Sequence, residues 1–159
     1  MQRLFEWPDG LVADLVLLSK TPIVTARYTG FRREHGVPVR TTVGAPKYWR
    51  SNRQGDLVHF KEMAPYKILG NAALKTDEDQ RRAYWMRCEE LAVPIVQTMA
   101  EIARTHPDQT LCLLCFEDVH KGQQCHRRWF ARWFEMRFGL LIPEWTPEAP
   151  EAQQLSFDV

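Results

Sequence analysis

The chain has 159 residues and a net charge of +1, with 45% hydrophobic and 26% charged residues. This composition is ordinary for a soluble globular domain and excludes a chain that is disordered throughout. No apolar run approaches the roughly 20 residues of a membrane-spanning helix, and the first ten residues lack the apolar stretch of a secretory signal. We therefore expect a cytoplasmic protein without membrane contact, whose four cysteines are reduced.

The first half of the sequence contains short apolar and β-branched segments. Residues 11–18 are apolar and fit either a helix or an edge strand. Residues 21–28 predict a buried strand followed by a loop, residues 37–43 predict a second strand, and residues 57–60 a third.

The longest helical pattern lies in the middle of the chain. Thr76 or Asp77 is the expected N-cap, because acidic residues follow in the first turn. The pattern then runs from about residue 79 to 105. Pro94 lies inside it and predicts either a kink or two abutting helices.

A strand, a loop and a helix are expected next. Residues 110–116 form an apolar run with the character of a central strand buried on both faces. A polar loop separates it from a helix expected over residues 126–138, which Gly139 would end. Residues 140–142 are a candidate last strand.

Alternation of strands and helices predicts an α/β fold with a mostly parallel sheet flanked by helices, Rossmann-like in the loose sense. We expect a single domain over residues 1–145 and an acidic, proline-containing tail over residues 146–159. Ligands of such sheets bind at the carboxyl ends of the strands, which directs attention to residues 117–128.

Chemically reactive side chains gather there. Cys115 and Glu117 end the expected strand, and three further candidates open the helix. A helix N-terminus offers unpaired N–H groups and a positive dipole end, which lower the pKa of a thiol and bind anions. A forked guanidinium adds to such an anion site. The candidate catalytic residues are Cys115, Glu117, Cys125 and His126, and the candidate anion-binding residue is Arg127.

This Cys-x-Glu … Cys-His-Arg pattern resembles the signature of the "domain of unknown function 488" family. Residues 23–30 resemble the first strand of that family with its arginine, here Arg27. Weaker matches in the same order are residues 43–46, 63–65 and 141–144. The resemblance covers roughly residues 21–145 and implies a compact α/β domain with a candidate pocket, in which Arg27 would be a second anion-binding residue. It implies no established reaction.

Each cysteine also has a purely structural interpretation. Cys115 in an apolar strand is by default a small core residue, and Cys88 is expected in the core as well. Cys112 lies three positions before Cys115, so the two side chains should face opposite sides of the sheet. A zinc site that added Cys125 and His126 to these two would have enough ligands, but the strand points the first two apart. We therefore expect no metal.

Two further features have competing interpretations. Arg127 binds either a ligand or an acidic neighbour such as Glu117, and a first-turn arginine is expected to contribute little to packing. Residues 28–53 combine aromatic and basic side chains, as in a single-strand nucleic-acid surface or in a solvated face with a few packed aromatics. Aromatic pairs within residues 129–134 predict a helix stripe packed on the sheet.

Two functions fit these features. The first is an enzyme acting on a nucleotide or nucleic acid, in which Arg127 holds phosphate, Cys125 is a nucleophile or oriented thiol, and Glu117 is an acid or base. The second is a non-catalytic module that binds a nucleotide or nucleic acid through the same site. The glycine patterns of dinucleotide-binding folds and P-loops do not occur, so no such cofactor is expected.

Overall fold

The computed structural model describes residues 7–147, so the expected tail lies outside the described residues from residue 148 onwards. A four-stranded sheet, entirely parallel, has the strand order β1-β4-β2-β3. The strands are β1 (Ile23–Arg27), β2 (Val37–Arg40), β3 (Val58–His59) and β4 (Leu111–Cys115). The predicted α/β fold with a parallel sheet is confirmed.

Strand β4 occupies a central position between β1 and β2. All five of its residues are buried, as expected for an apolar run that packs on both faces. Its last residue, Cys115, pairs in register with Arg27 of β1, and Leu114 pairs with Arg40 of β2. The carboxyl ends of these three strands therefore meet at one edge of the sheet.

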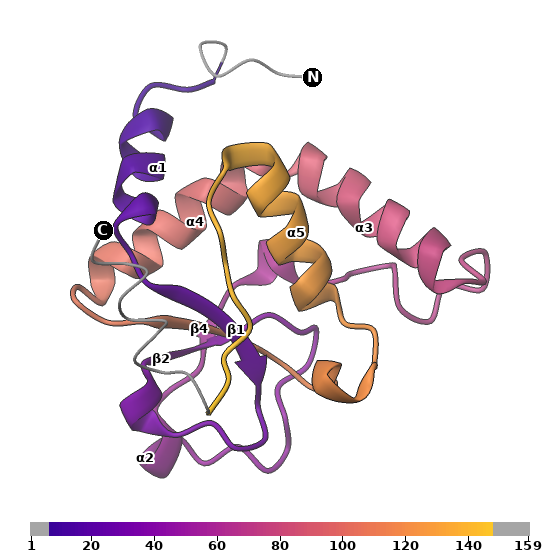
Figure 1. Cartoon of the computed structure of the whole chain (residues 1–159), viewed down its shortest axis with the longest axis horizontal. Helices are drawn as coiled ribbons and strands as arrows, with labels where there is room; N and C mark the ends of the chain where they lie inside the picture. Colours follow the sequence, from indigo (N-terminus) through magenta and orange to yellow (C-terminus); the bar gives the residue numbers. More distant parts are fainter. Residues whose placement is uncertain (1–6, 148–159) are drawn as a thin grey trace.

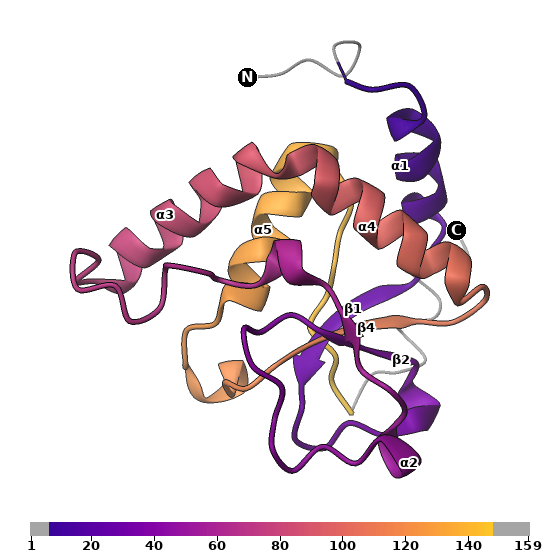
Figure 2. The ribbon, with the colours of Figure 1, turned by 180° about the vertical axis from the view of Figure 1, so that it is seen from behind.

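The longer helices all cover one face of the sheet, whereas loops cover the other (Figures 1 and 2). The helices are α1 (Leu11–Ser19), α2 (Ser51–Gln54), α3 (Asp77–Glu90), α4 (Ala92–Thr105) and α5 (His126–Phe138). On the loop-covered face, Trp49, Leu57 and Trp145 pack against the sheet. No helix within residues 7–147 has the length and apolar character needed to cross a bilayer.

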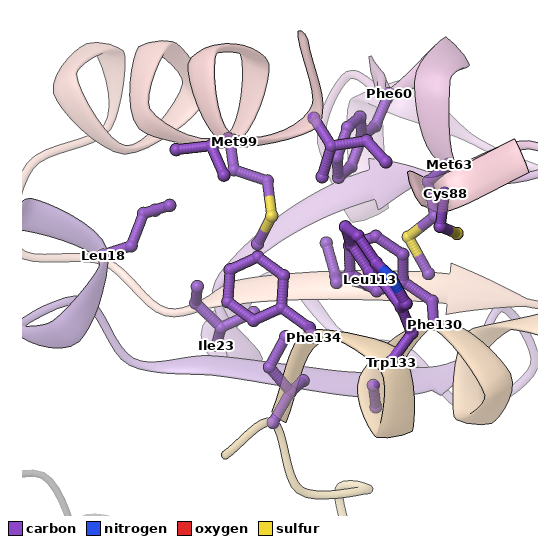
Figure 3. Packing of buried hydrophobic residues seen from close by; sticks show 14 of the residues in the cluster. Leu18, Ile23, Phe60, Met63, Cys88, Met99, Leu113, Phe130, Trp133 and Phe134 are labelled. Carbon is purple, nitrogen blue, oxygen red and sulfur yellow. The ribbon is translucent and has the colours of Figure 1, made fainter. Parts of the chain in front are cut away.

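The main hydrophobic core lies between the helices and the sheet. Figure 3 shows Leu18 of α1 and Met99 of α4 close to Ile23 of β1 and to the aromatic side chains of α5. Phe130 and Phe134 stack with their ring centroids 5.7 Å apart and are fully buried. The predicted aromatic stripe of this helix therefore packs in the core. This packing fixes the orientation of the first turn of α5 relative to β4.

The helical pattern in the middle of the chain forms two abutting helices. Thr76 is the N-cap of α3, because its hydroxyl accepts a hydrogen bond from the Asp79 N–H at 3.0 Å. Leu91 ends this helix, and Pro94 is the third residue of α4. At that position a helical N–H has no partner within the helix, so a proline fits without a kink.

Residues 140–142 form no strand, which corrects the sequence-based expectation. Among the described residues this segment meets β1 at one isolated bridge, between Thr25 and Glu144. The Thr25 N–H donates to the Pro143 carbonyl at 3.0 Å, and the Trp145 N–H donates to the Thr25 carbonyl at 2.8 Å. The next step of a parallel ladder would need an N–H from Pro143, which proline lacks.

Candidate functional site

A cleft of about 400 Å³ opens at the carboxyl edge of the sheet. Its walls are formed by the chain that follows β2, by the segment after the 3-10 turn Lys61–Met63, and by the end of β4 with the start of α5. Among the residues that line it are Gly44, Tyr66, Lys67, Cys115, Phe116, Glu117 and His126. Three of the four candidate catalytic residues therefore reach one cavity, at the place where ligands bind in open α/β sheets.

Cys115 lines this cleft, and Cys125 lies beside it. Their Sγ atoms are 2.9 Å apart, and the Cys115 Sγ is also 2.9 Å from Oε2 of Glu117. Both thiols are free and buried. Cys125 is the N-cap of α5, where its sulfur accepts a hydrogen bond from the Arg127 N–H at 3.4 Å. A sulfur thus takes the position that serine or aspartate oxygens usually occupy.

The surroundings place one negative charge on this pair, at Cys125. Burial by itself raises the pKa of Cys125, but the hydrogen bond from Cys115 and the positive charge of Arg127 outweigh it and lower this pKa. The pKa of Cys115 is raised by its hydrogen bond with Cys125 and by burial. The resting pair is therefore the thiolate of Cys125 beside the protonated thiol of Cys115.

Glu117 adds an ionised carboxylate to the same wall. Burial raises its pKa, but hydrogen bonds to the carboxylate outweigh burial and lower the pKa below its ordinary value. Because Glu117 is only half-buried and lines the cleft, it can exchange a proton with a bound ligand.

His126 is oriented by the loop after β2. Its Nε2 lies 2.8 Å from the Thr41 carbonyl oxygen, which can only accept, so Nε2 carries the hydrogen. Its Nδ1 then faces the Cys115 Sγ at 3.6 Å. The Thr41 hydroxyl donates to the Leu114 carbonyl at 2.7 Å, which ties this loop to β4. The imidazole is thus positioned as a proton acceptor for Cys115.

Arg127 is fully buried and makes an internal ion pair, which corrects the expectation that it contributes little to packing. Its partner is Glu144 rather than Glu117: Nε and Nη2 donate to the two Glu144 carboxylate oxygens at 3.0 and 2.9 Å. Nη1 donates to the Glu117 carbonyl at 2.8 Å and to the Cys125 Sγ at 3.2 Å. Binding of an external anion by Arg127 stays a prediction.

Glu144 belongs to this site although no sequence pattern indicated it. It comes from the segment after α5, and its Oε1 also accepts a hydrogen bond from the Thr25 hydroxyl at 2.7 Å. Arg128 is half-buried, and it donates to the Thr25 hydroxyl and the Ile142 carbonyl. The sequence shows only that the pair of adjacent arginines at a buried helix start requires acceptors from elsewhere in the chain.

Arg27 does not reach the cleft. Although it pairs in register with Cys115, its guanidinium donates to Asp118 and to the Phe116 carbonyl, both at 3.3 Å. It lines a separate cavity of about 100 Å³, together with Cys112 and Trp145. Neither Arg27 nor Arg127 is among the residues that line the cleft.

The four residues of the rejected zinc alternative are only partly brought together. Donor atoms of Cys115, Cys125 and His126 lie within 4.8 Å of one another and could hold a metal ion. Cys112 faces the opposite side of the sheet, as its position in the strand predicted, and its sulfur lies 3.5 Å from the His35 carbonyl. Two thiolates on one tetrahedral zinc are about 3.8 Å apart, so an ion would have to separate the two sulfurs. The absence of a metal stays a prediction.

In the basic segment over residues 28–53, most of the aromatic side chains pack against one another. Tyr28 and Phe31 are buried and contact Trp49, with ring centroids 5.9 and 5.6 Å apart. Tyr48 is exposed. Three of the four aromatics thus stabilise the loop-covered face of the sheet, which supports the interpretation as a solvated face with packed aromatics.

One comparison with known proteins bears on this site. The family model described as "Domain of unknown function DUF488" matches residues 37–134, more than half of the chain. The chain belongs to this family. The match confirms the resemblance seen in the sequence and includes the DUF488 segment from Cys115 to Arg127, whereas Glu144 lies beyond it. No curated protein and no solved structure matches the chain.

Proposed function

We propose that this DUF488 protein is a thiol-dependent enzyme that acts on a small phosphate-bearing molecule, such as a nucleotide, bound in the cleft. The observation that carries the proposal is a row of groups that begins at the cleft wall and continues behind it. Glu117, Cys115 and Cys125 follow one another at 2.9 Å, and the guanidinium of Arg127 closes the row at 3.2 Å from Cys125. Such a row activates a nucleophile.

Within this row, Cys115 is the sulfur that meets the ligand, because it lines the cleft and Cys125 lies behind it. The Cys115 proton passes to Nδ1 of His126 and leaves a Cys115 thiolate facing the cleft. Glu117 then serves as the acid or base toward the ligand. This arrangement assigns Cys125 the role of an oriented thiol.

The walls of the cleft suit a nucleotide. Its volume of about 400 Å³ falls in the range of small-molecule sites. Tyr66 and Phe116 line it and expose 37% and 42% of their surfaces, so their rings can stack on a base. Lys67 supplies a positive charge for phosphate.

A binding module without catalysis is the second candidate, and the burial of the two sulfurs favours it. Only 1% of Cys115 and 3% of Cys125 are exposed to solvent. A ligand can occupy the cleft and contact Tyr66, Phe116 and Lys67 without reaching a sulfur atom.

The experiment has a binding step and a chemical step. Thermal midpoints are measured with a panel of ribonucleoside mono- and diphosphates, and nucleotide conversion is followed by phosphorus NMR. We expect stabilisation by at least one nucleotide, weakened at least tenfold in apparent affinity by Lys67→Ala and unchanged by Lys20→Ala, an exposed control outside the cleft. Cys115→Ser should retain binding and abolish conversion.

The possible results separate the proposed enzyme from the binding module. If no nucleotide stabilises the protein, the proposed substrate class is wrong. If nucleotides bind but are not converted by the wild-type protein, or are converted equally by Cys115→Ser, the thiol-dependent reaction is wrong and the binding module is supported.

A further inference from the structure

The sulfur atoms of Cys115 and Cys125 lie close enough to be joined. We propose that Cys115 and Cys125 form a reversible disulfide, so that this domain carries a two-electron redox site in addition to the function proposed above. The proposal concerns the oxidation state of the pair and does not depend on which ligand the cleft binds.

The geometry needs little change for a bond to form. The Sγ atoms are 2.9 Å apart and a disulfide bond is about 2.05 Å long, so the remaining approach is less than about 1 Å. Cys125 has an extended backbone (φ −147°, ψ 136°) as the N-cap of α5, so it lies outside the helix proper. Side-chain rotation at this position leaves the helical hydrogen bonds intact.

The charges around the pair suit thiol oxidation. This chemistry needs one thiolate and a second sulfur that can displace a leaving group from the first. Arg127 supplies two N–H groups to the Cys125 sulfur, from its backbone at 3.4 Å and from Nη1 at 3.2 Å. Because Cys115 lines the cleft, a small oxidant reaches the pair from that side, whereas the burial of both sulfurs excludes bulky thiols.

The oxidant in the proposed reaction is hydrogen peroxide. The proton of Cys115 moves to Nδ1 of His126, and the Cys115 thiolate attacks one peroxide oxygen. An S–O bond forms, the O–O bond breaks, and the departing hydroxide takes the proton from His126 and becomes water. The Cys125 thiolate then attacks the Cys115 sulfenic sulfur and releases hydroxide. The two sulfurs lose two electrons in total, and peroxide is reduced to water and hydroxide.

The other two cysteines are separated from this pair by the fold. Cys88 is buried on α3, and burial raises its pKa to about 12. Cys112 lies on the opposite face of the sheet, and burial raises its pKa to about 12 as well. Both are protonated at neutral pH and react slowly with peroxide. They are therefore matched internal controls.

Oxidation would change the cleft wall itself. The bond would close a short loop that contains Phe116 and Glu117, both of which line the cleft. It would also move the Cys115 sulfur, which lies 2.9 Å from Oε2 of Glu117. The redox state of the pair thus acts on the groups that a ligand meets.

The test uses the full chain and needs no ligand. Reduced protein is treated with hydrogen peroxide, denatured with an alkylating agent, and analysed by intact mass and peptide mapping. We expect the loss of two hydrogen atoms, protection of Cys115 and Cys125 alone from alkylation, and full reversal by dithiothreitol. The variants Cys88→Ala and Cys112→Ala should oxidise like the wild type, whereas Cys125→Ser should stop at the addition of oxygen to Cys115.

Three outcomes would overturn the proposal. One is that all four thiols of the wild-type protein remain open to alkylation after excess peroxide. Another is a cross-link that includes Cys88 or Cys112. The third is one equivalent of zinc in chelator-washed protein, which would make the pair a metal site. Nucleotide binding is measured separately on reduced protein, so failure of the redox proposal leaves the proposed function to its own test.

Discussion

Arg127 and Glu144 form a bidentate ion pair that joins the first turn of α5 to the segment crossing β1. The same guanidinium donates to the Cys125 sulfur at 3.2 Å. The carboxylate therefore orients the cation that stabilises the thiolate. Through this one buried side chain, the chain after α5 is connected to the cysteine pair at the cleft.

Loss of Arg127 should destabilise the fold. We expect Arg127→Ala to lower the free energy of unfolding by about 3–5 kcal/mol, because Glu144 would keep a largely buried charge without its guanidinium partner. Arg127→Lys keeps the charge but cannot hold both carboxylate oxygens and the sulfur, so it should lose less. Urea unfolding measures both variants.

The matched control for this prediction is Arg132→Ala. Arg132 lies on the same helix but is exposed, so its loss should change the free energy of unfolding by less than about 0.5 kcal/mol. Equal unfolding midpoints for the two alanine variants would show that the ion pair does not stabilise the domain.

The cysteine pair should make stability depend on pH. The pKa of Cys125 is lowered to about 6 in the folded chain, against about 8.5 in an unfolded chain. Its contribution to stability is therefore fully present above pH 8.5 and is lost as the pH falls through 6. The difference in unfolding free energy between the wild type and Cys125→Ser should grow from pH 6 to pH 8.5, measured in urea with a reductant present.

Cys112→Ser is the control for this pH series. Burial raises the pKa of Cys112 to about 12, so both its folded and unfolded forms stay mainly protonated below pH 8. Its difference from the wild type should be flat over most of the range. A flat series for Cys125→Ser as well would contradict the assignment of the thiolate.

Replacing Gly36 by alanine should destabilise the fold more than the same replacement at Gly30. It has a φ of +141°, and a Cβ at this position would lie 2.2 Å from the Thr110 carbonyl oxygen, which accepts the hydrogen bond that starts β2. Gly30 also has a positive φ, +86°, but its Cβ would meet open space. We expect Gly30→Ala to cost about 1 kcal/mol from backbone strain.

Gly36→Ala adds a collision with backbone to the same kind of strain, so it should cost several times more or prevent folding. Thermal unfolding of the two variants compares them directly. Similar midpoints would mean that β2 and the start of β4 approach less closely than the structure describes.

The local elements followed from the sequence alone. The apolar run before Glu117 predicted β4, and α5 begins after Cys125 and ends before Gly139 as expected. These features depend on neighbours within one strand or a few helical turns, so the sequence carries them directly. The same short strand–loop–helix unit holds Cys115 and Cys125, which is why the candidate site was found without a structure.

Tertiary structure decided the partners of the site residues. Glu144 reaches Arg127 because the chain returns across β1 after α5, and the lack of an N–H on Pro143 limits that return to one bridge. Arg27 ends its strand beside Cys115 but points into another cavity. Contacts between residues far apart in sequence and the directions of side chains at strand ends are set by packing of the whole domain. A linear pattern contains neither of them.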